Sequence, residues 1–185
     1  SSVERGSVLL IGGNASALWR DYSFDMYPHT VASLTLADTG LADWAGCVSY
    51  LKMYSPAAVI YCLDGREQAD IAAVFVQTAA TALNSVRIYF VSALQGDDLQ
   101  GVNQAVMTAC ESYPNAEFVD VYSLMLTEEG TENLEYISGT VTPAGLRLLG
   151  KTVFNAVTFD IPVFSRAVDI GIMAPISTTL SQFIV

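Results

Sequence analysis

The sequence predicts an α/β protein with a three-layer α/β/α architecture, in which a five-stranded parallel sheet lies between two layers of helices. Short apolar runs typical of strands alternate with longer segments whose apolar residues recur every three or four positions, as on one face of a helix. The central runs are apolar at nearly every position, which is typical of parallel strands covered on both sides. Right-handed crossovers between such strands place helices on both faces of the sheet.

Five segments have the composition of strands. The first, SVLLIGG, runs into a glycine turn, and the third and fourth, AAVIYCL and VRIYFVSAL, are almost continuously apolar. In chain order the predicted strands are 7–13, 30–36, 57–63, 86–94 and 116–124. Because chemistry in open parallel sheets tends to lie at the carboxyl ends of the strands, the residues after each strand are the first candidates for function.

Four further segments have helical periodicity. The last begins at Thr142, whose hydroxyl can accept hydrogen bonds from the first helical turn, and Pro143 suits the first helical position. The predicted helices are 41–54, 66–83, 98–113 and 142–157. With a hydrophobic content of 52%, the chain can bury one full core, and we predict a single α/β domain over residues 1–158.

The charge balance limits the class of partner. The 185 residues include 19 acidic and 8 basic side chains, so the net charge of −11 repels phosphate backbones and anionic lipid headgroups. We therefore expect neither nucleic acid nor a membrane as a partner. No apolar run approaches the ~20 residues that cross a bilayer, and the start SSVERGS lacks the charged-then-apolar order of a signal peptide.

The cysteines and the single histidine give no sign of a metal site. Cys47, Cys62 and Cys110 fall in apolar patterns without a spacing such as C-x-x-C, which predicts buried thiols, although one pair could form a disulfide if two of them met. His29 follows a proline at the entrance to a strand, where a loop or edge histidine is expected. We expect no metal and no cofactor.

The order of elements, together with the stretches VLLIGG, LADWAGCVSYL, PAAVIYCL, AEFVDVYSL and TPAGLRLLG, resembles the SGNH (GDSL) hydrolase superfamily over roughly residues 7–157. The resemblance implies a flavodoxin-like sheet with strand order 2-1-3-4-5. Members of that family are esterases, lipases and carbohydrate deacetylases. They use a serine nucleophile, a histidine base with its aspartate, and a glycine and an asparagine that help to hold the oxyanion.

The early sites of the resemblance are altered in this chain. Where the family has Gly-Asp-Ser, the chain has Gly12, Gly13 and Asn14, and an amide cannot normally serve as the nucleophile. Asn14 is also a preferred helix N-cap, whatever its ancestry. The oxyanion glycine corresponds to Gly40, or Ala37 takes its place in another register.

The later sites of the resemblance are altered as well. In place of Gly-x-Asn-Asp stand Asp64, Gly65, Arg66 and Glu67, with Arg66 at the asparagine position. Arg66 and Glu67 are expected to open a helix, where Glu67 suits the positive helix end and Arg66 is either solvated or paired with Asp64.

The last block of the family pattern, Asp-Gly-x-His-Leu-Thr-Pro-x-Gly, decides the interpretation. Aligning TPAGLRLLG places Thr140 at the histidine and Ile137 at the aspartate. Without an imidazole the triad has no base, and loss of the serine or the histidine removes most of the catalysis in such triads. The resemblance therefore implies an enzyme fold that has lost its catalytic groups.

Three functional hypotheses remain open. The first is a non-catalytic domain that binds a small molecule, a carbohydrate or a protein. The second is a hydrolase with relocated groups, for instance Ser16 or Ser138 as nucleophile with Asp64 or Glu67 as base. The third is a flavodoxin-like binder of phosphate or nucleotide through the Gly12 turn.

The location of the protein is also open. Low lysine content, acidity and the family's many secreted members slightly favour an extracellular or cell-surface location. Three unpaired cysteines would equally fit a reducing compartment.

The C-terminal segment 159–185 breaks the alternating pattern with two prolines and with apolar residues on both parities. One interpretation is an extra strand or arm that packs on the same core. The other is a segment that docks on a second copy or on a neighbouring domain, which would make the chain part of an oligomer.

Deletion of residues 160–185 tests both interpretations. Full burial of one large apolar side chain contributes ~1.5–3 kcal/mol, so the truncated chain should melt at a lower temperature or change its size distribution. Thermal unfolding and size-exclusion chromatography measure these effects. A truncated chain with the stability, solubility and assembly state of the full chain would show that the segment has no such role.

Overall fold

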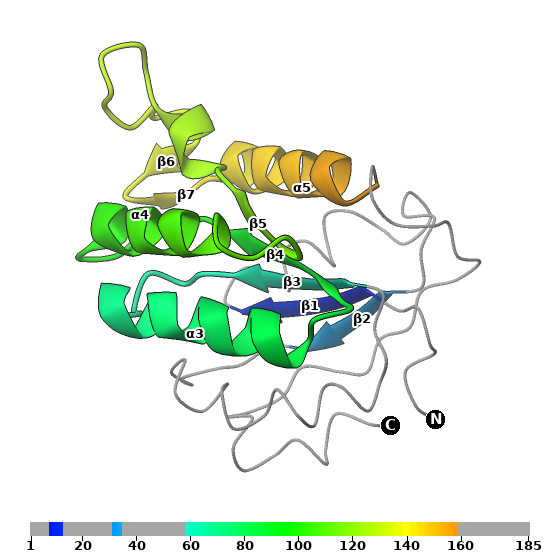
Figure 1. Ribbon diagram of the computed structural model, residues 1–185. Coiled ribbons are helices and arrows are strands. Elements are labelled where there is room, and N and C mark those ends of the chain that lie inside the picture. Colours follow the sequence, from blue (N-terminus) through cyan, green and yellow to red (C-terminus); the bar gives the residue numbers. More distant parts are fainter. Residues whose placement is uncertain (1–7, 13–30, 35–57, 159–185) are drawn as a thin grey trace.

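The computed structural model describes residues 8–12, 31–34 and 58–158, and Figure 1 shows a central sheet with helices packed on it and a small separate hairpin. All strand pairings in the five-stranded sheet are parallel, and the strand order is β2-β1-β3-β4-β5. The strands are β1 (Val8–Gly12), β2 (Val31–Leu34), β3 (Ala58–Cys62), β4 (Arg87–Val91) and β5 (Ala116–Val119). The predicted class, an α/β protein with a parallel sheet and helices, is confirmed.

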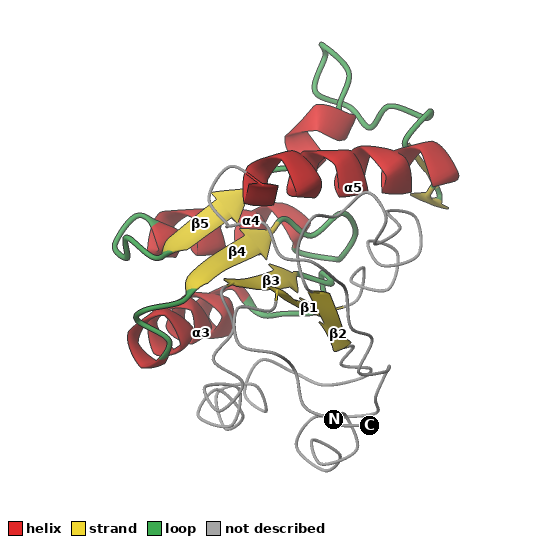
Figure 2. Cartoon of the chain, turned by 90° about the vertical axis from the view of Figure 1, so that its right-hand side faces the viewer, coloured by secondary structure: helices red, strands yellow, loops and turns green. Residues whose placement is uncertain are grey.

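The helices of the described residues cover both faces of the sheet. They are α3 (Ala69–Ala82), α4 (Leu99–Cys110), the short 3₁₀ helix η2 (Tyr122–Met125) and α5 (Pro143–Thr158). In Figure 2 the sheet lies between α3 and α5. The helix expected over 41–54 and the C-terminal segment 159–185 lie outside the described residues.

The strands β3 and β4 are buried on both faces of the sheet because alternate residues of each strand enter different cores. Val59 and Tyr61 of β3 pack with α3 and α4, whereas Ile60 and Cys62 pack with α5. On the first face, the Tyr61 ring lies 5.5 Å from the ring of Phe75 in α3, measured between ring centroids. This two-sided burial explains why β3 is apolar at every position.

The last strand of the sheet is shorter than the predicted range 116–124. β5 ends at Val119, and Tyr122 begins η2, so the expectation of a strand through residue 124 is wrong. The cause is the buried side chain of Ser92, whose Oγ accepts hydrogen bonds from the amides of Val121 at 2.9 Å and Tyr122 at 3.0 Å. These hydrogen bonds turn the chain away from the sheet. Because they join residues 29 and 30 positions apart, the periodicity of the sequence does not reveal them.

A two-stranded hairpin that was not predicted precedes the last helix. Its strands are β6 (Ile137–Ser138) and β7 (Thr140–Val141), joined through Gly139 at a φ of 72°. Such short strands have no detectable period. The predicted cap of α5 is confirmed, because the amide of Gly145 donates a hydrogen bond of 3.0 Å to the Oγ1 of Thr142.

Two of the three cysteines lie in the described part of the chain. Cys62 and Cys110 are buried and free, as predicted, and burial raises the pKa of each thiol to about 12. Cys47 lies outside the described residues. Among the helices that the structure describes, none has the length and apolar content needed to span a bilayer.

Candidate functional site

The carboxyl ends of β1, β3 and β4 form the edge of the sheet at which the sequence places its candidate residues. Gly12, the last residue of β1, has a φ of 103°, and a Cβ added there would lie 2.1 Å from the carbonyl oxygen of Cys62. Only glycine permits this close approach of β1 to β3. Backbone packing therefore accounts for the first glycine of the turn without a ligand.

The loop that follows β3 is closed by its own charged side chains. Glu67 accepts hydrogen bonds from the amides of Asp64 at 2.9 Å and Gly65 at 2.8 Å, one with each carboxylate oxygen. Asp64 accepts hydrogen bonds from the Arg66 amide at 2.8 Å and from the Arg66 guanidinium at 3.0 and 2.7 Å. The structure thus brings Asp64, Arg66 and Glu67 into one hydrogen-bonded loop.

The expectation that Arg66 and Glu67 open a helix is wrong, because α3 begins only at Ala69. The Glu67 carboxylate folds back onto the two preceding amides, and Gln68 has an extended backbone as the N-cap. Burial raises the pKa of Glu67 above its ordinary value, although these amide hydrogen bonds oppose the shift. Glu67 therefore serves as a structural carboxylate that closes the loop.

The loops after β3 and β4 touch through their backbones. A Cβ added to Gly65 would lie 1.6 Å from the carbonyl oxygen of Gln95, and one added to Gly96 would lie 2.3 Å from the carbonyl oxygen of Gly65. The side-chain amide of Gln95 donates a hydrogen bond of 3.1 Å to the carbonyl of Gly139 in the β6–β7 hairpin. This series of contacts connects the Asp64 loop to the hairpin that carries Thr140.

The two residues at the positions of the family's histidine and aspartate have different surroundings. Thr140 is exposed in β7 and pairs with Ser138. Ile137 is only 3% exposed and packs in the core beneath α5, where an ionised carboxylate would be costly. Among the described residues, no hydrogen bond joins the exposed Ser138 hydroxyl to a base.

Several candidates cannot be placed because they lie outside the described residues. These are Gly13, Asn14, Ser16, His29, Ala37 and Gly40. Within the residues that the structure does describe, no group of three or more histidine, cysteine, aspartate or glutamate side chains could hold a metal ion.

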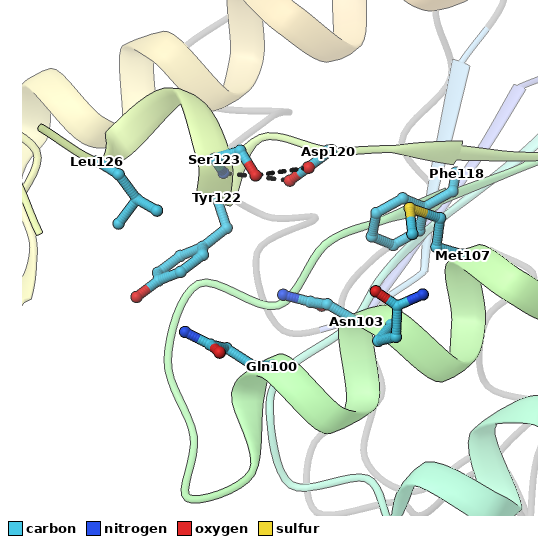
Figure 3. Close-up of a pocket in the computed structure, with 9 residues that line it drawn as sticks. Gln100, Asn103, Met107, Phe118, Asp120, Tyr122, Ser123 and Leu126 are labelled. Atoms are coloured by element: carbon cyan, nitrogen blue, oxygen red, sulfur yellow. Dashed lines mark hydrogen bonds between the residues drawn. The ribbon is translucent and has the colours of Figure 1, made fainter. Parts of the chain in front are cut away.

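Two cavities near this edge were missed by the sequence analysis. The larger, of about 550 Å³, is lined by residues that include Gln95, Gly96, Glu132 and Gly139. The smaller, of about 230 Å³, lies between α4 and η2 and is shown in Figure 3. Tyr122 lines both. Their polar lining consists mostly of amides and hydroxyls, which carry no motif that a search for titratable groups would find.

Comparisons with known proteins identify the fold. No protein-family model matches the chain, and no curated protein matches it. Two solved structures from Streptococcus pneumoniae are similar, each with a TM-score of 0.61. One is a protein named for platelet activating factor, 14% identical, with 85% of this chain and 86% of that chain covered.

The second similar structure is the C-terminal catalytic domain of peptidoglycan O-acetyltransferase A with a methylsulfonyl adduct. It is 15% identical, and the match covers 89% of this chain and 99% of that chain. Together these likenesses show that the chain has an SGNH-like α/β fold. At such low identity they do not extend to activity.

The Gly65 contact yields a matched pair of substitutions. Gly65 and Gly130 have similar φ values of 89° and 83°, but a Cβ at Gly130 would have nothing within 4 Å. Gly130→Ala should therefore cost only the backbone term, about 1 kcal/mol. Gly65→Ala adds a collision with the Gln95 backbone and should lower the free energy of unfolding by about 3 kcal/mol or more. Urea denaturation measures both, and equal costs would contradict the backbone contact.

The raised pKa of Glu67 predicts the sign of a pH effect. The folded state holds the Glu67 proton more tightly than the unfolded state, so the wild type loses stability as the pH rises through the interval above the ordinary glutamate pKa of 4.5. Glu67→Gln removes this titration. The free energy of unfolding of Glu67→Gln minus that of the wild type should therefore increase across this interval. At higher pH this difference should stay constant.

Urea denaturation at several pH values measures the effect, with Glu111→Gln, the same change at an exposed position, as the matched control. A wild-type stability that instead rises against Glu67→Gln as the pH increases would mean that the two amide hydrogen bonds outweigh burial.

Proposed function

We propose that this chain is a non-catalytic binding domain on an SGNH-like fold, with a small molecule, a carbohydrate or a protein as its ligand. The observation that carries the proposal is the use of the charged groups at the edge of the sheet. Both oxygens of Glu67 accept backbone hydrogen bonds, and Asp64 is paired with Arg66. Each carboxylate oxygen of this loop already accepts at least one hydrogen bond from within the loop, which disfavours Asp64 and Glu67 as the base for a nucleophile.

The residues aligned with the triad support the same proposal. Ile137 belongs to the core, and Thr140 offers a hydroxyl in place of an imidazole. The only histidine in the sequence, His29, comes before the second strand, whereas the resemblance places the family's site residues after strands.

A hydrolase with relocated groups is the second candidate. The observation that favours it is the raised pKa of Glu67, since a carboxylate with a raised pKa is a stronger base. One similar structure is also a catalytic domain. Against it stand the two hydrogen bonds that occupy Glu67. The phosphate-binding alternative is weaker, because the packing of Gly12 on Cys62 already explains that glycine.

For the whole chain we propose a three-layer domain over residues 1–158 with strand order 2-1-3-4-5. The C-terminal segment 159–185 packs on this domain or on a partner, including a second copy. We also propose an extracellular or cell-surface location. A neighbour whose name refers to peptidoglycan is compatible with that location.

An esterase assay tests the proposal. Because Asn14 and Thr140 stand at the nucleophile and base positions of the resemblance, the chain should hydrolyse p-nitrophenyl acetate and acetylated sugars no faster than a heat-unfolded control. Asn14→Ser alone should also be inactive, since the new hydroxyl would have no base.

Two outcomes would contradict the proposal. Saturable turnover by the wild type that disappears in Ser16→Ala or Ser138→Ala would favour the hydrolase with relocated groups. Turnover by the single variant Asn14→Ser would show that a base is present near that position.

A further inference from the structure

Tyr122 stands between two cavities that the resemblance does not explain. The cavity of about 550 Å³ reaches from the loop after β4 to the β6–β7 hairpin, and the cavity of about 230 Å³ lies over α4. The smaller one alone is below the usual volume of a ligand site, but the two together fall within the range of ~300–1,000 Å³. A ligand that uses both would extend past the Tyr122 ring.

The walls of these cavities combine neutral polar groups with apolar surface. In Figure 3 the side chains of Gln100 and Asn103 extend from α4 toward the Tyr122 ring, and Phe118 and Met107 lie together at the other side of the cavity. Primary amides donate and accept hydrogen bonds at once, as hydroxyl groups of a ligand do. Aromatic and thioether side chains offer surface for C–H groups.

Charge excludes several classes of ligand. None of the described residues that line the two cavities is a lysine, an arginine or a histidine, whereas Asp120 and Glu132 are acidic. The N-terminus of α4 lies beside both cavities, and such an end attracts anions. Asp98, however, places its carboxylate over this end, where a Cβ on Gly101 would lie 2.4 Å from Oδ1. Phosphorylated and other anionic ligands are therefore disfavoured.

The side chains around Tyr122 are held in place before any ligand arrives. The Ser92 hydroxyl accepts a hydrogen bond from the backbone amide of Tyr122, and the Tyr122 hydroxyl donates a hydrogen bond of 3.3 Å to Glu132. Asn103 bonds both the amide and the carbonyl of Ala93, at 2.8 and 3.0 Å. Such preorganisation lowers the entropic cost of binding. Among the described residues, no hydrogen bond holds the amide of Gln100, so this group can turn to a ligand.

We propose that the two cavities form one groove for a neutral oligosaccharide, with sugar units on both sides of Tyr122. Sugars present alternating hydroxyl groups and apolar C–H faces, which match the amides and the aromatic surface, and they need no cationic partner. This inference rests on the proposed binding function and names its ligand class and its site. The Tyr122 ring provides the stacking surface, and Gln100 provides a directional hydrogen bond.

Titration calorimetry on the full chain tests the groove with cellotetraose, maltotetraose and chitotetraose as neutral probes. Tetragalacturonate serves as the anionic probe, and an uncharged alanine–serine tetrapeptide as the peptide probe. We expect saturable binding of at least one neutral tetrasaccharide and none of the other two probes. Tyr122→Ala should weaken that binding about tenfold, through loss of the stacking surface.

Gln100→Ala removes one hydrogen bond and should weaken binding about threefold to tenfold. Because it changes an exposed side chain, it remains informative if Tyr122→Ala fails to fold. Gln77→Ala, the same change at an exposed position of α3, is the matched control and should bind as the wild type does.

Three results would overturn the inference: no binding of any neutral tetrasaccharide, binding that Tyr122→Ala and Gln100→Ala leave unchanged, or preference for tetragalacturonate or the tetrapeptide. The esterase assay on the same preparation separates this inference from the proposed function. Ester turnover with intact glycan binding refutes only the non-catalytic assignment, and an inert chain that binds no neutral glycan refutes only the groove.

Discussion

The approach of two backbones at Gly65 and Gly96 is the constraint on which the edge of the sheet depends. Neither loop could lie where it does with a side chain at these positions, because a Cβ at Gly65 would lie 1.6 Å from the carbonyl oxygen of Gln95. Once the two loops touch, Gln95 reaches the carbonyl of Gly139, and the hairpin before α5 is tied to the end of β4. Gln95, Gly96 and Gly139 of these segments line part of the larger cavity.

The charged side chains at this edge serve the shape of the loop. Glu67 closes the loop by accepting hydrogen bonds from two backbone amides. The Arg66 guanidinium forms an ion pair with the neighbouring Asp64. In an enzyme with this sheet, the same positions would have to keep polar groups available to a substrate. In the proposed binding groove, the groups that would contact a ligand lie further along the edge, at Gln100 and at the ring of Tyr122.

Local patterns predicted what local forces determine. The apolar run of β3 is visible in the sequence because both faces of that strand are buried, and the start of α5 is visible because Thr142 and Pro143 act within one turn. The end of β5 was missed because Ser92, 29 residues earlier, supplies the hydrogen bond that ends it. The contact between Gln95 and Gly139 spans 44 residues and has no local signal either.

The candidate residues of the site were only partly predictable for the same reason. The resemblance selected Asp64, Arg66 and Glu67 as neighbours in sequence, and they are neighbours in space. It could not show that these side chains form hydrogen bonds within their own loop, since that depends on how Glu67 folds back onto the amides of Asp64 and Gly65. Tyr122 and Gln100 come from different elements, and only the packing of η2 near α4 brings them to one cavity.

The burial of Cys62 and Cys110 has a consequence for the chemical robustness of the fold. With a pKa of about 12, each thiol is ionised in only roughly 10⁻⁵ of the molecules at pH 7, and the thiolate is the species that attacks electrophiles and disulfides. The two thiols should therefore react only slowly with oxidised glutathione, peroxide and alkylating reagents. The described core would therefore keep the same covalent structure in a reducing and in an oxidising environment.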